Sequence, residues 1–404
     1  MTRVLLVCPE PLGHGQPAGI GIRFVEMAKV LRADGHAVTL MTPDSDQPIA
    51  PANLLAASEQ HDVAVVQGHV ANELFAHAKP IPTVVDLYDP FIVENFHYHA
   101  ERGAEVFAHD HATLLQSLLR GDLFLCASEA QRFFYLGALL AVGRLNPVAF
   151  ANDAHLDSLV RIAPFGVEPP RAMATPDLDA PAILFGGVYD WYDPILAIDA
   201  VAIARETSPR TTLTFTRHPN PAITPQGKLA EAIAYAEKKR YDFVRFEPWA
   251  PYGERGAFFD RFAMALLTFP QSIETDLSMR TRIYDDLWAA LPIVTSSAPG
   301  TDELLARYGA GTIVKSEEPR DFANAITAIV HDRARHEAMR NATRAFVDEH
   351  QWSRTLAPLR EFVRAPRFDS TKETFAVRLQ TPEHVPTFVE RVKRRIRRAT
   401  GAAS

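Results

Sequence analysis

The sequence predicts an α/β protein of two doubly wound domains, followed by a basic C-terminal tail. Short apolar runs alternate with longer stretches of helical periodicity, which is the order expected of βαβ units. The runs are rich in Val, Leu and Ile without polar alternation, as in parallel strands buried on both faces. The same order begins again after a proline-rich join, so a second domain follows the first.

The first half of the chain shows this pattern from its start. A helix is expected over residues 22–33, because Phe24, Met27 and Leu31 recur on one helical face and Gly35 is a typical stop signal. The predicted strands of this half cover residues 4–8, 38–41, 63–67, 83–86, 123–127 and 161–163.

The second half repeats the pattern, with helices expected over residues 195–205 and 281–290. Residues 164–181 between the halves are proline-rich and lack periodicity, so they are predicted to form a linker. The predicted strands of the second half cover residues 182–186, 212–216, 243–246, 264–269, 292–295 and 312–314. The expected units are residues 1–165, residues 166–365 and a tail over residues 366–404.

Composition narrows the class of protein. The 404 residues are 47% apolar and 23% charged, which excludes a mainly disordered chain. The net charge of −7 argues against a nucleic-acid partner. Cys8 and Cys126 are the only cysteines, which favours a reducing compartment. No apolar run approaches the roughly 20 residues of a membrane span, so a cytoplasmic protein is expected.

Candidate site residues follow the predicted strands, because ligands bind beyond the carboxyl ends of strands in open parallel sheets. The loop over residues 11–21 is glycine-rich and precedes a helix, so Gly19 and Gly21 could let its backbone approach an anion. A flexible connecting loop is the alternative interpretation. The loop does not match the dinucleotide-binding fingerprint, since Pro17 interrupts the glycine spacing.

Two acids and a histidine follow the fourth predicted strand. Asp86 and Asp89 could act as a base or bind sugar hydroxyls, although Asp89-Pro90 is also a common turn opener. His97 follows in a predicted helix, where a lone histidine is more often a packing or surface residue than a ligand.

The second half adds aromatic side chains and arginines. Tyr189 and Trp191 follow Gly187 at a strand-to-helix junction, where aromatic rings could stack on a base or a sugar, or form a packed corner. Arg280 and Arg282 stand at a predicted helix start, where both could bind an anion. A solvated, charged helix start is the alternative.

These residues together resemble the retaining glycosyltransferases of the large group-one family, which have the GT-B fold of two Rossmann-like domains facing a cleft. Residues 162–167 are similar to the family's interdomain I-P-N-G-V junction, and residues 285–294 to its E-A-x-A-x-G-x-P-V block. Residues 300–303 resemble its glycine-x-x-Glu turn. The resemblance implies that Asp285 binds the ribose of a nucleotide diphosphate sugar and that Glu274 contacts the donor sugar. No metal and no other cofactor are expected, because the acid pairs Asp86/Asp89 and Asp190/Asp193 are no obvious metal cage and the histidines are not spaced as ligands.

The subgroup suggested by Trp191, Thr281 and Trp288 makes cell-surface polysaccharides or lipopolysaccharide. A glycan or lipid-linked acceptor is therefore expected, and Asp89 and His97 are the candidates for its side of the site. A nucleotide-sugar 2-epimerase of the same fold and a non-catalytic nucleotide-sugar-binding module remain open as alternatives.

The sequence departs from the family at three positions. Val188 and Asp193 stand where the family has the Arg and Lys that bind the donor diphosphate, so Arg280, Arg282 and Arg217 are assigned to it. Asp86 stands where the family has a histidine, which leaves open an inverting reaction with Asp86 as base.

The tail ends in a basic segment. Six of the eight residues Arg391 to Arg398 are Arg or Lys, and Phe388, Val392 and Ile396 recur every four residues. A helix over these residues would carry a narrow apolar stripe flanked by positive charge. Such a helix suits an anionic membrane surface, which would make the protein peripheral at the inner face of the plasma membrane. A solvated terminus and a helix docked on the first domain are the alternatives.

Overall fold

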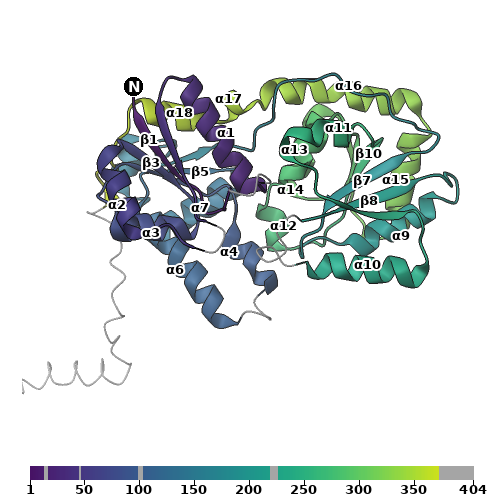
Figure 1. Ribbon diagram of the computed structural model, residues 1–404, viewed down its shortest axis with the longest axis horizontal. Coiled ribbons are helices and arrows are strands. Elements are labelled where there is room, and N and C mark those ends of the chain that lie inside the picture. The colour runs from purple at the N-terminus through teal and green to yellow at the C-terminus, as the bar shows by residue number, and fades with distance from the viewer. Residues whose placement is uncertain (13–16, 45–46, 99–102, 219–225, 373–404) are drawn as a thin grey trace, which may run out of the picture.

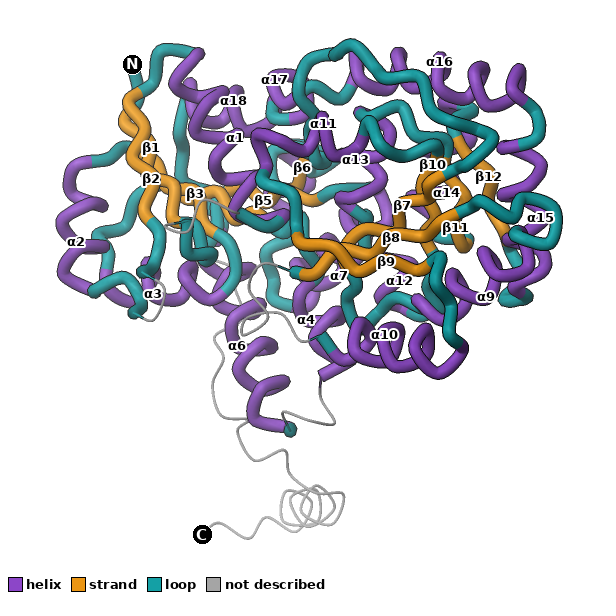
Figure 2. Tube along the Cα trace, turned by 45° about the vertical axis from the view of Figure 1, so that its right-hand side comes forward, coloured by secondary structure: helices purple, strands orange, loops and turns teal. Residues whose placement is uncertain are grey.

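The computed structural model describes residues 1–12, 17–44, 47–98, 103–218 and 226–372 (Figure 1). They form two α/β domains side by side, each built on a parallel six-stranded sheet that lies between helices (Figures 1 and 2). The strand orders are β2-β1-β3-β4-β5-β6 and β12-β11-β10-β7-β8-β9. The predicted fold class of two doubly wound domains is confirmed.

All the predicted strands are present, with ends that shift by one or two residues. The first sheet comprises β1 (Arg3–Val7), β2 (Ala37–Met41), β3 (Val63–Val66), β4 (Thr83–Asp86), β5 (Leu123–Cys126) and β6 (Val160–Ile162). The second comprises β7 (Ala182–Gly187), β8 (Thr212–Arg217), β9 (Val244–Pro248), β10 (Met264–Leu267), β11 (Ile293–Ser296) and β12 (Gly311–Val314). The central strands are buried throughout, which explains their continuous apolar runs.

Helices cover both faces of each sheet. Those of the first half are α1 (Gly19–Ala33), α2 (Pro51–Gln60), α3 (His69–His77), α4 (Phe91–Glu94), η1 (Asn95–Tyr98), α6 (Ala104–Arg120), α7 (Glu129–Ala141) and α8 (Pro147–Asn152). Those of the second half are α9 (Pro194–Ala204), α10 (Gly227–Lys239), η2 (Tyr252–Glu254), α11 (Arg255–Phe259), α12 (Ile273–Leu277), α13 (Thr281–Trp288), α14 (Pro299–Tyr308), α15 (Pro319–Val330) and α16 (Arg333–Glu349). Two further helices are α17 (Trp352–Thr355) and α18 (Ala357–Arg364).

The helix predicted over 281–290 ends at Trp288. Ala290 has a φ of 54°, in the left-handed region, and Pro292 follows two residues later, so the helix cannot continue.

The two cysteines, Cys8 and Cys126, are buried free thiols.

The chain returns to the first domain after α16. In Figure 1, α17 and α18 lie above the first domain beside α1. Arg360 on α18 pairs with both carboxylate oxygens of Asp34, at 2.6 and 2.7 Å, and Thr2 Oγ1 donates to the carbonyl of Val363 at 2.9 Å. Residues 352–364 thus pack with the first domain, whereas the sequence assigned them to the second.

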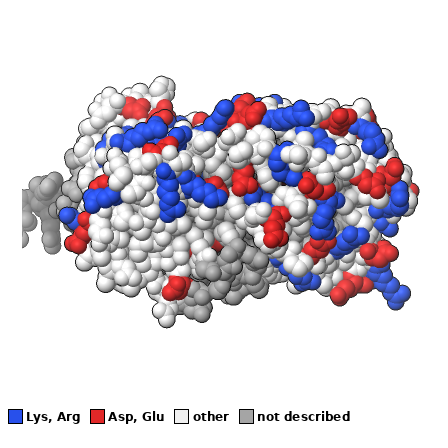
Figure 3. Space-filling model, turned by 45° about the horizontal axis from the view of Figure 1, so that its top comes forward, with Lys and Arg blue, Asp and Glu red and all other residues white. Residues whose placement is uncertain are grey.

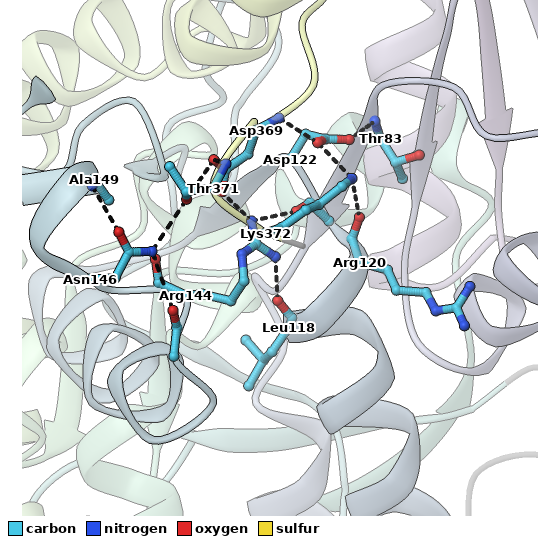
Figure 4. A network of polar contacts seen from close by, with 12 residues as sticks. Thr83, Leu118, Arg120, Asp122, Arg144, Asn146, Ala149, Asp369, Thr371 and Lys372 are labelled. Atoms are coloured by element: carbon cyan, nitrogen blue, oxygen red, sulfur yellow. Dashed lines mark hydrogen bonds and ion pairs between the residues drawn. The ribbon is translucent and has the colours of Figure 1, made fainter. Parts of the chain in front are cut away.

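The residues that follow α18 are also held on the first domain, by contacts that we call the C-terminal clasp (residues 369–372; Figure 4). Asp369 pairs with Arg144 at 2.7 Å, and Lys372 Nζ pairs with Asp122 at 2.7 Å. Asn146 donates to Thr371 Oγ1 at 3.3 Å. The predicted basic segment of the tail lies outside the described residues.

Charge on the described surface is mixed. On the face shown in Figure 3, basic and acidic side chains lie beside one another over the second domain, and charge is sparse on the lower part of the first. This face carries no basic stripe of the kind that binds nucleic acid. Among the helices that are described, none is long and apolar enough to span a membrane.

Candidate active site

The main cavity has a volume of about 830 Å³ and lies where the carboxyl ends of the two sheets face each other. The first domain lines it with the β1–α1 loop and with the loops after β3 and β4. The second domain contributes the loop after β7, the end of β8 and the start of α13. The position is the one predicted from the strand pattern.

An aromatic wall closes the second-domain side. The rings of Tyr189 and Trp191 are stacked with centroids 4.9 Å apart and planes inclined by 3°, and both line the cavity. Tyr98 and His97 approach Trp191 from the first domain, at centroid distances of 6.4 and 6.3 Å. Three predicted site residues, Tyr189, Trp191 and His97, are thus brought together at the boundary between the domains.

Arg280 does not offer an unpaired charge to a ligand, contrary to the prediction. It forms a two-fold ion pair with Glu274, one contact of which is 2.7 Å, and both side chains are almost completely buried. The guanidinium lies 4.9 Å from the ring centre of Phe269 and 5.3 Å from that of Tyr192. Arg280 still lines the cavity, whereas Glu274 does not, and the contact of Glu274 with a donor sugar stays a prediction.

Arg282 and Arg217 also lie differently from the prediction. Arg282 donates to the backbone carbonyls of Phe185, at 2.6 Å, and Gly187, so its charge holds the end of β7 instead of facing the cavity. Arg217 is exposed at the end of β8, with its guanidinium 6.0 Å from the Phe246 ring, and does not line the cavity.

Gly187, another predicted site residue, lies where a Cβ would meet Trp249 at 2.8 Å, so this glycine permits close packing.

Asp86 is not the cavity-facing base that the sequence suggested. Its carboxylate is buried and pairs with Arg23, with Nε–Oδ2 at 2.6 Å and Nη2–Oδ1 at 3.1 Å. The same guanidinium donates to the carbonyls of Ala163 and Pro164, at 2.8 and 3.1 Å. Asp86 therefore positions Arg23 on the chain that leaves the first domain.

Four acids line the cavity, namely Glu10, Asp89, Glu94 and Asp110, and of these Asp89 and Glu94 interact with each other. Burial raises the pKa of Asp89, and burial together with the neighbouring Asp89 charge raises the pKa of Glu94 well above its usual range. The interaction between the two carboxyl groups lowers the pKa of Asp89 and raises that of Glu94, so Glu94 is the more readily protonated member of the pair. Ser278 of the second domain donates to Glu94 Oε1 at 3.2 Å. Sequence reasoning missed Glu94, because α4 is a single short turn without a periodic pattern.

The glycine-rich loop already holds an anion, which is the chain's own Glu10. Its carboxylate accepts from the backbone N–H of Ala18 at 2.5 Å and of Gly21 at 2.6 Å, at the start of α1. A Cβ at Gly21 would lie 2.8 Å from both Glu10 and Leu12, so a larger residue there would have to displace these side chains. Burial raises the pKa of Glu10, and the two N–H contacts oppose this. Gly19 lines the cavity beside it.

Replacing Glu10 by alanine is expected to destabilise the protein by about 1 kcal/mol, because α1 has no other side-chain cap. Urea unfolding measures the change. Glu59→Ala, at an exposed position of α2, is the matched control and is expected to unfold like the parent. Equal unfolding midpoints for Glu10→Ala and the parent would contradict the capping role.

Asp285 lies away from the main cavity. Its Oδ1 is 3.4 Å from Nε of Arg255, which also pairs with Glu168 at 3.1 Å. Burial raises the pKa of Asp285, and Arg255 opposes this. Arg255, Glu168 and Trp288 line a second cavity of about 710 Å³. The ribose-binding role of Asp285 remains a prediction.

No metal-binding group was found in the part of the chain that the structure describes: no three or more His, Cys, Asp or Glu side chains come together there in a way that could hold a metal ion.

No protein-family model and no curated protein matches this sequence. Solved structures do match. HepE from Anabaena in complex with UDP and glucose is 14% identical, with a TM-score of 0.62 over 90% of this chain and 100% of that one. Sucrose-phosphate synthase from Thermosynechococcus elongatus is 13% identical, with a TM-score of 0.60 over 90% and 98%. TarM from S. aureus is 10% identical, with a TM-score of 0.53 over 78% and 59%. The two facing parallel sheets and these likenesses together show that the chain has the GT-B fold.

Proposed function

We propose that the protein is a glycosyltransferase that moves a sugar from a nucleotide diphosphate sugar to an acceptor across the main cavity. The observation that carries this proposal is the make-up of the cavity, which joins the aromatic wall of the second domain to the acid pair Asp89 and Glu94 of the first. Aromatic rings stack on bases and sugars, and carboxyl groups bind hydroxyls or exchange protons. The UDP and glucose bound by HepE support the same substrate class.

In this proposal the donor lies against Tyr189 and Trp191, and the acceptor lies on the side of Asp89 and Glu94. Retention of configuration is favoured over inversion. An inverting reaction would use Asp86 as its base, and that acid is buried in an ion pair. The reaction needs no metal, and the product is a cell-surface glycan. The backbone N–H groups at the start of α13, beside Arg280, supply the partner for the departing diphosphate.

One observation favours a second candidate, a non-catalytic nucleotide-sugar-binding module. The charges of Arg280 and Arg282 are already engaged by Glu274 and by backbone carbonyls, so neither offers an unpaired cation to a diphosphate. Donor turnover separates the candidates. A transferase consumes donor only with acceptor, an epimerase of this fold consumes it without acceptor, and a binding module does neither.

Trp191→Ala is expected to weaken nucleoside diphosphate binding roughly tenfold, because a stacked base or sugar loses its platform. Isothermal titration with UDP, GDP and ADP measures the change and identifies the base. Phe368→Ala removes an exposed aromatic side chain that does not line the cavity, and it serves as the control. Unchanged affinity in Trp191→Ala would place the nucleotide elsewhere.

A further inference from the structure

The described lining of the main cavity is acidic on the side of the first domain. Its acids are Glu10, Asp89, Glu94 and Asp110. Among the described residues that line the cavity, the only Lys or Arg is Arg280, and Glu274 already pairs with its guanidinium. Ionised carboxylates accept hydrogen bonds and repel anions. This half of the cavity therefore favours a ligand group that donates hydrogen bonds and carries no negative charge.

Gln67 gives a second, independent indication of such a ligand. It follows β3 directly, lines the cavity and is only 3% exposed. Within the described part of the chain, no group donates a hydrogen bond to its Oε1. A buried amide oxygen without a donor costs roughly 1–3 kcal/mol, so such atoms nearly always have a partner. A hydroxyl or amino group bound in the cavity can supply the missing donor.

Asp110 is held in place by neutral neighbours. It lies on α6 one turn before Thr113, and both side chains line the cavity. Asn95 Nδ2 donates to Asp110 Oδ2 at 2.7 Å, and Asn72 Nδ2 donates to Thr113 Oγ1 at 2.8 Å. These contacts tie α6 to η1 and to α3, which lie beside it at the lower side of the first domain (Figure 1). Because Asn95 is uncharged, it orients the Asp110 carboxylate without neutralising it.

The topology brings these groups to one place. Gln67 follows β3 and Asp89 follows β4, and the two strands are parallel neighbours in the first sheet. Their carboxyl ends therefore meet at the same edge, on the opposite side of the cavity from the aromatic wall of Tyr189 and Trp191. The acceptor-only oxygens of Gln67 and Asp110 thus belong to the half of the cavity that the proposed function leaves to the acceptor.

We propose that this half of the cavity selects an acceptor sugar that binds through hydroxyl or amino groups and carries no anionic group there, and that Gln67 and Asp110 set this specificity. The inference rests on the proposed function, and it adds the chemical class of the acceptor. A uronate or a sugar phosphate would place its charge beside acids without a free cation among the described lining residues. It would also leave the Gln67 oxygen without a donor.

Sugar binding by the full chain tests the proposal directly, without turnover. Glucose, galactose and mannose are each titrated at pH 7.5 as the neutral sugar, the 2-amino sugar and the uronate, with binding followed by NMR. Within each scaffold that binds, the neutral or amino form is expected to bind about tenfold or more tightly than the uronate, because like charges repel and a polar site rejects a ligand that leaves its groups unpaired. The neutral and amino arms show which of the two donors is preferred.

Two variants assign the specificity to its residues. Gln67→Leu is expected to weaken the best neutral or amino sugar roughly tenfold, because its side chain no longer accepts a hydrogen bond. Asp110→Lys is expected to reverse the order, with a gain of roughly tenfold for the uronate. Asp348→Lys makes the same charge change at an exposed position of α16, outside the cavity, and is expected to keep the order of the parent. A variant that merely folds poorly would weaken every sugar instead of reversing the order.

Titration of the same proteins with UDP, GDP and ADP tests the proposed function separately. A uronate that binds the parent as tightly as its neutral form overturns the inference, and so does a parent that binds no sugar of the panel. An unchanged order in Asp110→Lys, with the fold intact by circular dichroism, removes Asp110 from the specificity and overturns it too. If nucleotide binding persists in these cases, the proposed function stands. The expected sugar order without any nucleotide binding would contradict the proposed function alone.

Discussion

Replacing Arg23 by alanine is expected to lower the free energy of unfolding by about 3–5 kcal/mol, because the change strands the Asp86 carboxylate in the core. Both side chains of the pair are fully buried. The substitution also removes the donors to the carbonyls of Ala163 and Pro164, where the chain leaves the first domain. Urea unfolding followed by circular dichroism measures the loss.

Two controls separate the buried charge from other effects. Arg3→Ala breaks the exposed pair with Asp62 and is expected to change stability little. The double variant Arg23→Met, Asp86→Leu removes both charges and is expected to recover much of the loss, since no charge remains unpaired. An unfolding midpoint for Arg23→Ala equal to that of the parent would show that the pair does not stabilise the fold.

Glu94→Gln is expected to reduce sugar transfer by about 10²–10⁴-fold while leaving nucleotide binding near the parent value. This expectation rests on the proposed function. A glutamine keeps the size and a hydrogen-bond donor but cannot give up or take a proton, and general acid–base catalysis contributes rates of that order. Initial rates and separate nucleotide titrations measure the two effects. Glu73→Gln on α3, outside the cavity, is the control.

The sign of the pH dependence follows from the raised pKa of Glu94. Because its folded pKa lies above the unfolded one, its contribution to stability is present below the unfolded pKa and is lost as pH rises through the folded pKa. Glu94→Gln should remove this part of the stability profile. If Glu94→Gln transfers sugar at the rate of the parent, the role of Glu94 is structural only.

The fold was predictable because buried parallel strands leave a local signature. A strand such as β3, with four buried residues, reads as an uninterrupted apolar run whatever lies beside it. The aromatic wall was predictable for a similar reason, since Tyr189 and Trp191 follow a strand end directly. Both inferences need only neighbours in the sequence.

The charged residues were harder, because their roles depend on partners that are distant in the sequence. The position of Asp86 at a strand end predicted a site acid, but its carboxylate pairs with Arg23, which is 63 positions away in the sequence. The position of Arg282 at a helix start predicted an anion binder, but its guanidinium donates to backbone carbonyls at the end of β7. Pairing of this kind is set by tertiary packing, which leaves no periodic trace.

The return of α17, α18 and the clasp to the first domain has a consequence for synthesis. The residues that complete this domain are made after the entire second domain, so its sheet must wait, with α1 and Asp34 uncovered, while that domain is translated. Domains that emerge early usually fold first as units. Here the order is inverted: the second domain is continuous and can fold as it emerges, and the first closes only after α17, α18 and the clasp have followed it.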